Sequence, residues 1–222
     1  MGRSKLAKFA AIGERDNVIE PGDDLYGQIK GKWGELQFQN NNPILLEVGC
    51  GRGEYTVGMA RLFPDKNFIG SDIKGARLWK GSTMAEEEEL NNVAFLRTFI
   101  EQLDDNFAAQ EVDEIWVTFP DPRPRDRDIK RRLTSPRFLE LYKTILKPEG
   151  ILHLKTDNLL LYEYTLEVLQ ERSAHIKDLR CTSDLYKSDL QQHTMGIYTT
   201  YERHYIAEGM PIKYLQFKFN LR

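Results

Sequence analysis

Hydrophobic and polar positions alternate in blocks along most of this chain. Short apolar runs, which predict buried strands, occupy residues 44–49, 68–73, 93–98, 114–120 and 150–156. The segments between them space their apolar residues at three and four, which predicts helices at residues 55–63, 74–90, 135–146 and 158–172. The pattern therefore predicts an α/β fold with a mostly parallel sheet and helices on both of its faces.

Both ends of the chain depart from this alternation. Near the C-terminus, residues 198–205 and 209–222 have strand-like composition with no helix between them. This predicts an antiparallel hairpin, which brings the sheet to seven strands. At the other end, residues 1–25 have few apolar side chains, a basic start and a turn-rich PGDD sequence. We interpret them as a flexible basic arm that precedes a single domain over residues 26–222.

Composition narrows the class of protein. A length of 222 residues suits one α/β domain, and 41% hydrophobic with 29% charged residues is typical of a protein that folds in water. No run approaches the roughly 20 apolar residues of a membrane span, and the N-terminus lacks a signal-peptide pattern, so we expect a cytoplasmic protein without membrane contact. Cys50 and Cys181 lack zinc or disulfide spacing, and the four histidines lack metal-ligand spacing, so we expect no metal.

Charge is unevenly distributed, although the formal net charge is only −3. Residues 121–137, here called the basic run, hold seven basic side chains against three aspartates. Such a run attracts polyanions when it lies on one face of a protein. A solvated charged loop is the alternative interpretation.

A glycine loop follows the first predicted strand. Gly49, Gly51 and Gly53 lie between an apolar strand and a helix, where the chain can turn tightly and approach a ligand. Dinucleotide enzymes require the spacing G-x-G-x-x-G, but position 54 is Glu54. Glu47, two residues before the first glycine, would repel a pyrophosphate but can hold the cationic amino end of S-adenosylmethionine. The loop therefore favours S-adenosylmethionine as the cofactor.

Two aspartates follow other predicted strands. Asp72 comes 21 residues after Gly51, at the place where an acidic residue accepts hydrogen bonds from ribose hydroxyls. Asp121 follows the fourth strand in a segment stiffened by three prolines. Because ligands bind outside the carboxyl ends of parallel strands, Asp121 faces the reacting centre and is the catalytic candidate. Glycine-rich turns and acidic strand ends also occur without ligands, which is the alternative.

Several motifs resemble known families. LLEVGCGRG is similar to the first motif of class I S-adenosylmethionine-dependent methyltransferases, and this resemblance covers residues 40–222. Four later motifs resemble the tRNA (guanine-N7)-methyltransferases: D-P-W-P-K, K-R-R, T-D-[NW] and T-x-Y-E. They correspond here to DPRPR, KRR, TDN and TTYE, at residues 121–125, 130–132, 156–158 and 199–202.

The chain departs from the family pattern at three positions. Arg123 stands where the family has tryptophan, and Arg125 where it has lysine. The charge is kept at 125, whereas at 123 an arginine can stack on a base or bind phosphate. The family aspartate that contacts the cofactor adenine falls at Phe99, so backbone groups there, or Glu101, substitute for it.

The resemblance implies methyl transfer from S-adenosylmethionine to N7 of guanine in tRNA, at guanine 46 of the variable loop. N7 already has a free lone pair, so the enzyme mainly orients the base and stabilises positive charge. Asp121 is expected to do both, while Asp157 or Glu202 accepts hydrogen bonds from guanine N1 and N2. The other expected substrate contacts are Arg125, Thr199, Thr200 and Tyr201.

The resemblance also assigns the remaining partners. The expected cofactor contacts are Glu47, Gly49, Gly51, Gly53, Asp72, Phe99 and Asp121. The expected tRNA phosphate contacts are Arg123, Arg127, Lys130, Arg131 and Arg132. We expect no obligate protein partner. The alternatives are a methyltransferase for another nucleic acid or a small molecule, an RNA-binding module without catalysis, and a nicotinamide-dependent oxidoreductase, which Glu54 disfavours.

Overall fold

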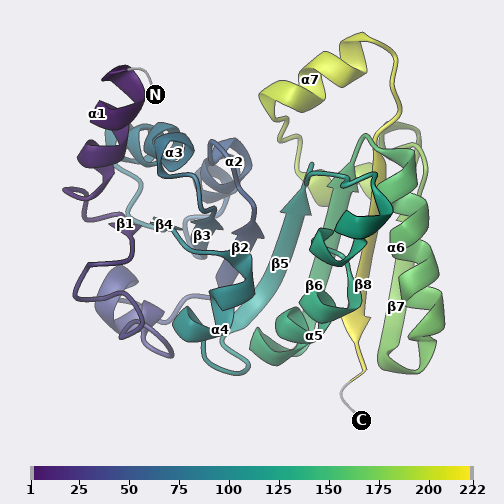
Figure 1. Cartoon of the computed structure of the whole chain (residues 1–222), viewed down its shortest axis with the longest axis horizontal. Coiled ribbons are helices and arrows are strands. Elements are labelled where there is room, and N and C mark those ends of the chain that lie inside the picture. The colour runs from purple at the N-terminus through teal and green to yellow at the C-terminus, as the bar shows by residue number, and fades with distance from the viewer. Residues whose placement is uncertain (1–2, 221–222) are drawn as a thin grey trace.

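One mixed β-sheet runs through the computed structural model, which describes residues 3–220 (Figure 1). Its strands are β1 (Val18–Ile19), β2 (Ile44–Val48), β3 (Asn67–Ser71), β4 (Val93–Leu96), β5 (Val112–Thr118), β6 (Leu146–Thr156), β7 (Ile176–Thr182) and β8 (Lys213–Phe219). They lie in the order β1-β4-β3-β2-β5-β6-β8-β7, and β8 runs antiparallel to both of its neighbours. This confirms the predicted mostly parallel α/β sheet, with β1 as an eighth strand.

Helices cover both faces of the sheet (Figure 1). The α-helices are α1 (Arg3–Ile12), α2 (Glu54–Leu62), α3 (Gly75–Glu87), α4 (Leu103–Asn106), α5 (Pro136–Ile145), α6 (Leu159–Glu171) and α7 (Thr200–Ala207). Shorter helical turns are η1 (Trp33–Phe38), η2 (Ile100–Gln102), η3 (Asp126–Arg131), η4 (Ser173–His175), η5 (Leu185–Lys187) and η6 (Asp189–Thr194). The four predicted helices correspond to α2, α3, α5 and α6.

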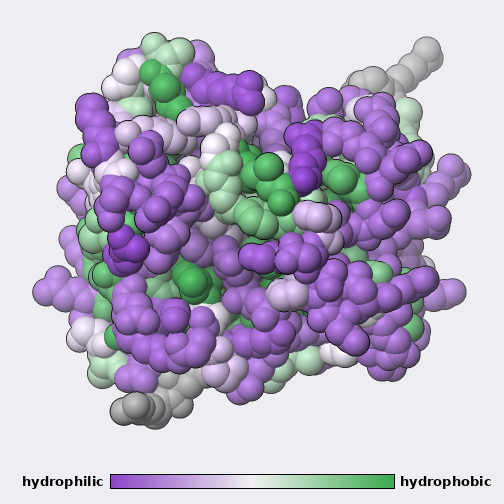
Figure 2. Space-filling view, turned by 180° about the vertical axis from the view of Figure 1, so that it is seen from behind, coloured by the Kyte–Doolittle hydropathy of each residue, from purple (hydrophilic) through white to green (hydrophobic). Residues whose placement is uncertain are grey.

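Two hydrophobic cores explain why the strands read as continuous apolar runs. On β2, Leu46 and Val48 face a core shared with α5 and α6, whereas Leu45 faces a second core shared with α1, α2 and α3. All five residues of β2 are buried, as expected for a central parallel strand covered on both sides. The surface seen from behind is mostly hydrophilic, with hydrophobic side chains gathered near its middle (Figure 2).

The C-terminal antiparallel strands are present, but they do not form a tight hairpin. β8 pairs with β6 and with β7, and the connection from β7 to β8 contains η5, η6 and α7. Most of the segment expected to be the first hairpin strand, residues 198–205, belongs to α7. The helix begins there because Thr199 and Glu202 form a reciprocal capping box, which stabilises the first turn.

The N-terminal segment carries structure that the sequence did not predict. Within residues 3–25, α1 packs against α3, and Ile12 at its end is fully buried. β1 extends the sheet by pairing with β4. Residues 1 and 2, the first of the expected arm, lie outside the described part of the chain. Within residues 3–220, no helix combines the length and apolar character needed to cross a membrane.

Candidate cofactor and substrate site

The glycine loop (residues 49–53) connects β2 to α2 at the carboxyl edge of the sheet. Gly49, Gly51 and Gly53 have φ values of 73°, 57° and 69°, which disfavour residues with a side chain. A Cβ at Gly53 would lie 2.6 Å from Cε1 of Phe95, whereas one at Gly51 would meet no atom within 4 Å. Gly53 therefore permits close packing of the loop, and Gly51 leaves open space beside the backbone.

Glu47 lies behind the glycine loop and is only 2% exposed. Its carboxylate accepts hydrogen bonds from the backbone N–H of Thr56, at 2.9 Å, and from the hydroxyls of Thr56 and Thr118. Burial raises the pKa of Glu47 to about 7, although these hydrogen bonds oppose the shift. Glu47 thus joins β2, β5 and α2 with a carboxyl group that titrates near neutral pH.

Asp72 supports the glycine loop from the end of β3. Its Oδ2 accepts a hydrogen bond from the backbone N–H of Gly51 at 3.1 Å, and its Oδ1 accepts one from the N–H of Lys74 at 2.8 Å. The side chain is buried but borders the cleft described next. Asp72 therefore fixes the loop and the start of α3 relative to each other.

Two adjacent cavities open beside the loop and share Gly49, Arg77 and Phe119 in their walls. The larger, of about 340 Å³, has the size of a small-molecule site. The expected site residues that border it are Gly49, Asp72, Phe99, Asp121, Arg123 and Arg131. The smaller, of about 90 Å³, is bordered by Glu47, Gly49, Gly51, Thr199 and Tyr201. The fold thus brings together most residues expected to hold the cofactor.

Asp121 projects from a firmly held segment after β5. Its side chain is 75% exposed, and Oδ2 lies 3.5 Å from Nη2 of Arg123. Phe119 and Arg123, on either side, both have positive φ, a strained conformation that must be held by the surroundings. The N–H of Phe119 donates to the carbonyl of Lys155 at 2.7 Å. The segment therefore presents an exposed carboxylate, paired with Arg123, at the mouth of the larger cavity.

The buried side chain of Arg132 holds the segment that carries Asp121 and is not available at the surface. It is 4% exposed, and its guanidinium donates to the carbonyls of Pro122 and Arg123 at 3.1 and 3.2 Å. The guanidinium carbon also lies 4.3 Å from the ring centre of Tyr164. This is a correction to the expected phosphate contacts, because a buried guanidinium bonded to two backbone carbonyls does not reach a phosphate at the surface.

The other cations of the basic run lie at the surface. Arg125, Arg127, Lys130 and Arg131 are exposed, and Arg123 is partly exposed. Asp128 accepts hydrogen bonds from Arg125 at 2.9 Å and from Arg131 at 3.3 Å. The buried Asp128 thereby orders two exposed arginines beside the cleft.

The turn at the start of α7 approaches the glycine loop. Thr200 donates to the carboxylate of Glu54 from its N–H, at 2.6 Å, and from its hydroxyl, at 2.7 Å. Glu54 therefore links the first turns of α2 and α7. Tyr201 is 60% exposed and borders the smaller cavity, whereas Thr199 is buried and caps the helix.

Glu202 is fully buried in an ion pair that the sequence did not predict. Its Oε1 lies 2.7 Å from Nζ of Lys155, and the Tyr186 hydroxyl donates to the same oxygen. Burial lowers the pKa of Lys155, although Glu202 opposes this shift. A lysine inside the apolar run 150–156 was the available signal, since a charge there needs a partner. Glu202 is therefore enclosed and does not face the cleft.

Asp157 follows β6 and is only partly buried. Its backbone carbonyl accepts a hydrogen bond from Nζ of Lys213 at 2.8 Å. Next to it, Asn158 caps α6 by accepting a hydrogen bond from the N–H of Leu161. Of the two acids expected to recognise guanine, Asp157 is thus the one with access to solvent.

The fold and the cleft define the class of protein. The strand order, the glycine loop after β2 and the cleft at the carboxyl ends of the strands are those of a Rossmann-like methyltransferase. The 16S rRNA methyltransferase KamB has this fold, with TM-score 0.62 and 18% identity over 84% of this chain and 91% of that one. So does a 16S rRNA (adenine(1408)-N(1))-methyltransferase from Catenulisporales acidiphilia with cosubstrate SAM, with TM-score 0.56 and 16% identity over 85% and 89%.

Sequence relatives define the family. A family model described as "Putative methyltransferase" matches residues 41–215. The tRNA (guanine-N(7)-)-methyltransferase of Cytophaga hutchinsonii is 49% identical over 99% of both chains. Its counterparts in Christiangramia forsetii and Listeria innocua are 48% and 37% identical, over 97% and 98% of this chain and 98% and 95% of theirs. The chain belongs to the tRNA (guanine-N(7)-)-methyltransferase family.

Proposed function

We propose that this protein transfers the methyl group of S-adenosylmethionine to N7 of a guanine in tRNA and releases S-adenosylhomocysteine. The observation that carries the proposal is the position of Asp121. Its exposed carboxylate borders the same cavity as Gly49 of the cofactor loop and Asp72. Relatives that are 46–49% identical carry the name of this activity.

The carboxylates and the aromatic ring around the two cavities suit this cofactor. S-adenosylmethionine supplies an electrophilic methyl group on a sulfonium. Asp72 at the larger cavity can accept hydrogen bonds from ribose hydroxyls, and Phe99, with its exposed ring, offers a surface for the adenine. Glu47, behind the smaller cavity, supplies negative charge for the amino end when its carboxyl group is ionised. The open space at Gly51 leaves room for the cofactor to approach the backbone.

Asp121 serves the transfer by orientation and charge. In the in-line displacement, the N7 lone pair forms the new bond to the methyl carbon while the bond from that carbon to sulfur breaks. Positive charge moves from sulfur onto the purine, and an adjacent carboxylate stabilises it there. No general base is required. The backbone around Asp121 is strained and is held by the hydrogen bond from Arg132 to the carbonyl of Pro122. It therefore keeps the carboxylate in the position needed to orient the guanine.

Recognition of guanine falls to the accessible groups of the cleft. Asp157 is the acceptor for guanine N1 and N2, because Glu202 is buried in its ion pair with Lys155. Tyr201 provides an exposed ring that can stack on the base. Thr199, Thr200 and Glu202 hold the turn that carries this ring.

The exposed cations of the basic run bind the tRNA backbone in this proposal. They are Arg123, Arg125, Arg127, Lys130 and Arg131. Their position beside the cleft supports phosphate binding over a solvated loop, and such binding weakens steeply with added salt. We propose that the enzyme acts in the cytoplasm and requires neither an obligate protein partner nor a metal.

The target position is tested with labelled cofactor and two transcripts. The proposal places the methyl group on guanine 46 of the variable loop. A tRNA transcript should accept labelled methyl, and the same transcript with adenine at that position should accept none. Equal incorporation into both transcripts would reject this position while leaving the guanine-N7 chemistry to be tested separately.

A further inference from the structure

Three cations lie at the N-cap and in the first turns of α3, on the side of the cleft opposite the basic run. Lys74, Arg77 and Lys80, here called the α3 rim, are all exposed. Within the described part of the chain, none of them forms an ion pair or a side-chain hydrogen bond. By contrast, Arg61 on α2 pairs with Glu88 at 2.5 Å. The side chains of the α3 rim therefore carry positive charge that no ion pair among the described residues neutralises.

The α3 rim spreads its charges over the start of the helix, with Lys74 at the N-cap and Arg77 and Lys80 following at steps of three. Steps of three residues along an α-helix keep side chains on neighbouring positions of one face. At a rise of about 1.5 Å per residue, Lys74 and Lys80 lie about 9 Å apart along the axis. The rim can thus contact more than one phosphate of an extended strand.

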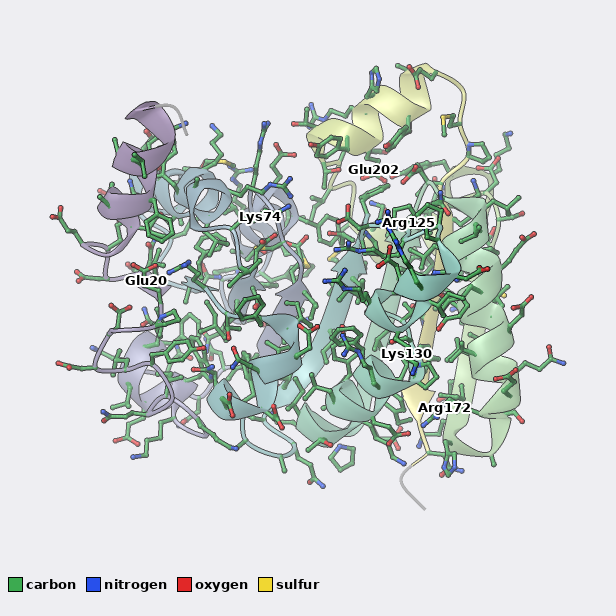
Figure 3. The ribbon with its side chains drawn as sticks, in the orientation of Figure 1. Glu20, Lys74, Arg125, Lys130, Arg172 and Glu202 are labelled. Carbon is green, nitrogen blue, oxygen red and sulfur yellow. The ribbon has the colours of Figure 1, made fainter. Side chains whose placement is uncertain are left out.

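The two walls of the larger cavity carry like charges. Lys74 and Arg77 border it from α3, and Arg123 and Arg131 border it from the basic run. Figure 3 shows Lys74 and Arg125 on either side of the carboxyl end of β5, with Glu202 beyond them. Asp121 and Glu101 are the exposed acids that border the same cavity. Cations on both walls suit a polyanion that crosses the cleft.

The rim continues toward α7. Lys80 and Arg203 border a shallow hollow together with Tyr198, which is partly exposed. Within residues 3–220, Arg203 also has no ion pair or side-chain hydrogen bond. Unpaired cations interleaved with an aromatic ring are typical of surfaces that bind single-stranded RNA.

We infer that the α3 rim is a second phosphate-binding surface, so that the tRNA backbone is held on both sides of the target nucleotide. The inference rests on the proposed function. A guanine inserted into the cleft has a phosphate on its 5′ side and another on its 3′ side, and the basic run lines only one wall. Because the whole chain is net negative, local cations are needed on the other wall to offset repulsion of the RNA.

A pair of lysine variants tests the inference. In Lys74→Ala/Lys80→Ala, tRNA affinity should fall, and the slope of log affinity against log salt should become less steep by about two, one for each lost phosphate contact. The matched control is Lys32→Ala/Lys143→Ala, which also removes two lysines without an ion pair, neither of them lining the cleft. The control should keep the wild-type slope.

Binding of S-adenosylhomocysteine separates the possible outcomes. It should fall far less than tRNA binding in Lys74→Ala/Lys80→Ala, because the inference assigns these lysines to RNA, although Lys74 also borders the cavity proposed for the cofactor. An unchanged salt slope, or a loss of S-adenosylhomocysteine binding that matches the loss of tRNA binding, would overturn the inference. If the inference is overturned in either of these ways but the wild type still makes 7-methylguanosine, the proposed function stands. If the wild type makes none, the proposed function fails, whatever the variants do.

Discussion

Nζ of Lys155 lies 2.7 Å from Oε1 of Glu202, and both side chains are completely excluded from solvent. The pair connects the end of β6 to the first turn of α7. Thr199 completes the connection, because its N–H donates to the Glu202 carboxylate. The turn that presents Tyr201 to the smaller cavity is therefore anchored to the sheet.

Removing one member of this pair should destabilise the protein strongly. Lys155→Met leaves a buried carboxylate without its cation, which costs about 3–5 kcal/mol. In urea unfolding, the double variant Lys155→Met/Glu202→Gln should recover part of that loss, since it removes the unpaired charge as well. A cost below about 1 kcal/mol for Lys155→Met would contradict the buried ion pair.

Glu47 should make stability depend on pH. Its pKa is raised in the folded state to about 7 from 4.5, so the folded protein keeps this proton where the unfolded chain releases it. This contribution is therefore full below about pH 4.5 and is lost as pH rises through about 7, a loss of about 3 kcal/mol. Urea unfolding of wild type and Glu47→Gln across this range measures it. Parallel pH profiles would refute the shifted pKa.

Two glycines of the loop should respond differently to alanine. Gly53→Ala forces a Cβ to within 2.6 Å of Phe95 in addition to a positive φ, so it should lower both thermal stability and cofactor affinity. Gly51→Ala has a similar φ but open space, so its stability loss should stay near 1 kcal/mol while affinity for S-adenosylhomocysteine falls steeply. Equal effects of the two variants on stability would argue against this packing role for Gly53.

Asp121 should matter for turnover and little for cofactor binding. Asp121→Ala should bind S-adenosylhomocysteine nearly as wild type does and lose at least about a hundredfold in kcat with tRNA, the scale of one lost electrostatic contact in a transition state. Asp126→Ala, which removes another exposed aspartate from the same loop, is the control and should keep near-wild-type kcat. A near-wild-type rate for Asp121→Ala would exclude the proposed role.

Periodicity and motif spacing predicted the core of the fold because strong local signals agreed with the tertiary structure. The glycine loop and the strands and helices from β2 to α6 follow from them. α7 was missed because its aromatic residues suggested a strand, although T-x-x-E at its start is also a capping-box signal. Lys155 inside an apolar run signals a buried charge that needs a partner, but which residue supplies that partner could not be predicted. Arg132 and Glu202 look like their exposed neighbours in sequence, and only the contacts with Tyr164 and Lys155 distinguish them.

Nucleoside analysis of the product tests most directly whether the protein methylates N7 of guanine in tRNA. The purified protein is incubated with unmodified tRNA and S-adenosylmethionine, and the digested tRNA is analysed by mass spectrometry. We expect the wild type to form 7-methylguanosine and Asp121→Ala to form much less of it. Methylation confined to other nucleosides would contradict the proposed function. So would the absence of any methylation by a protein that still binds the cofactor.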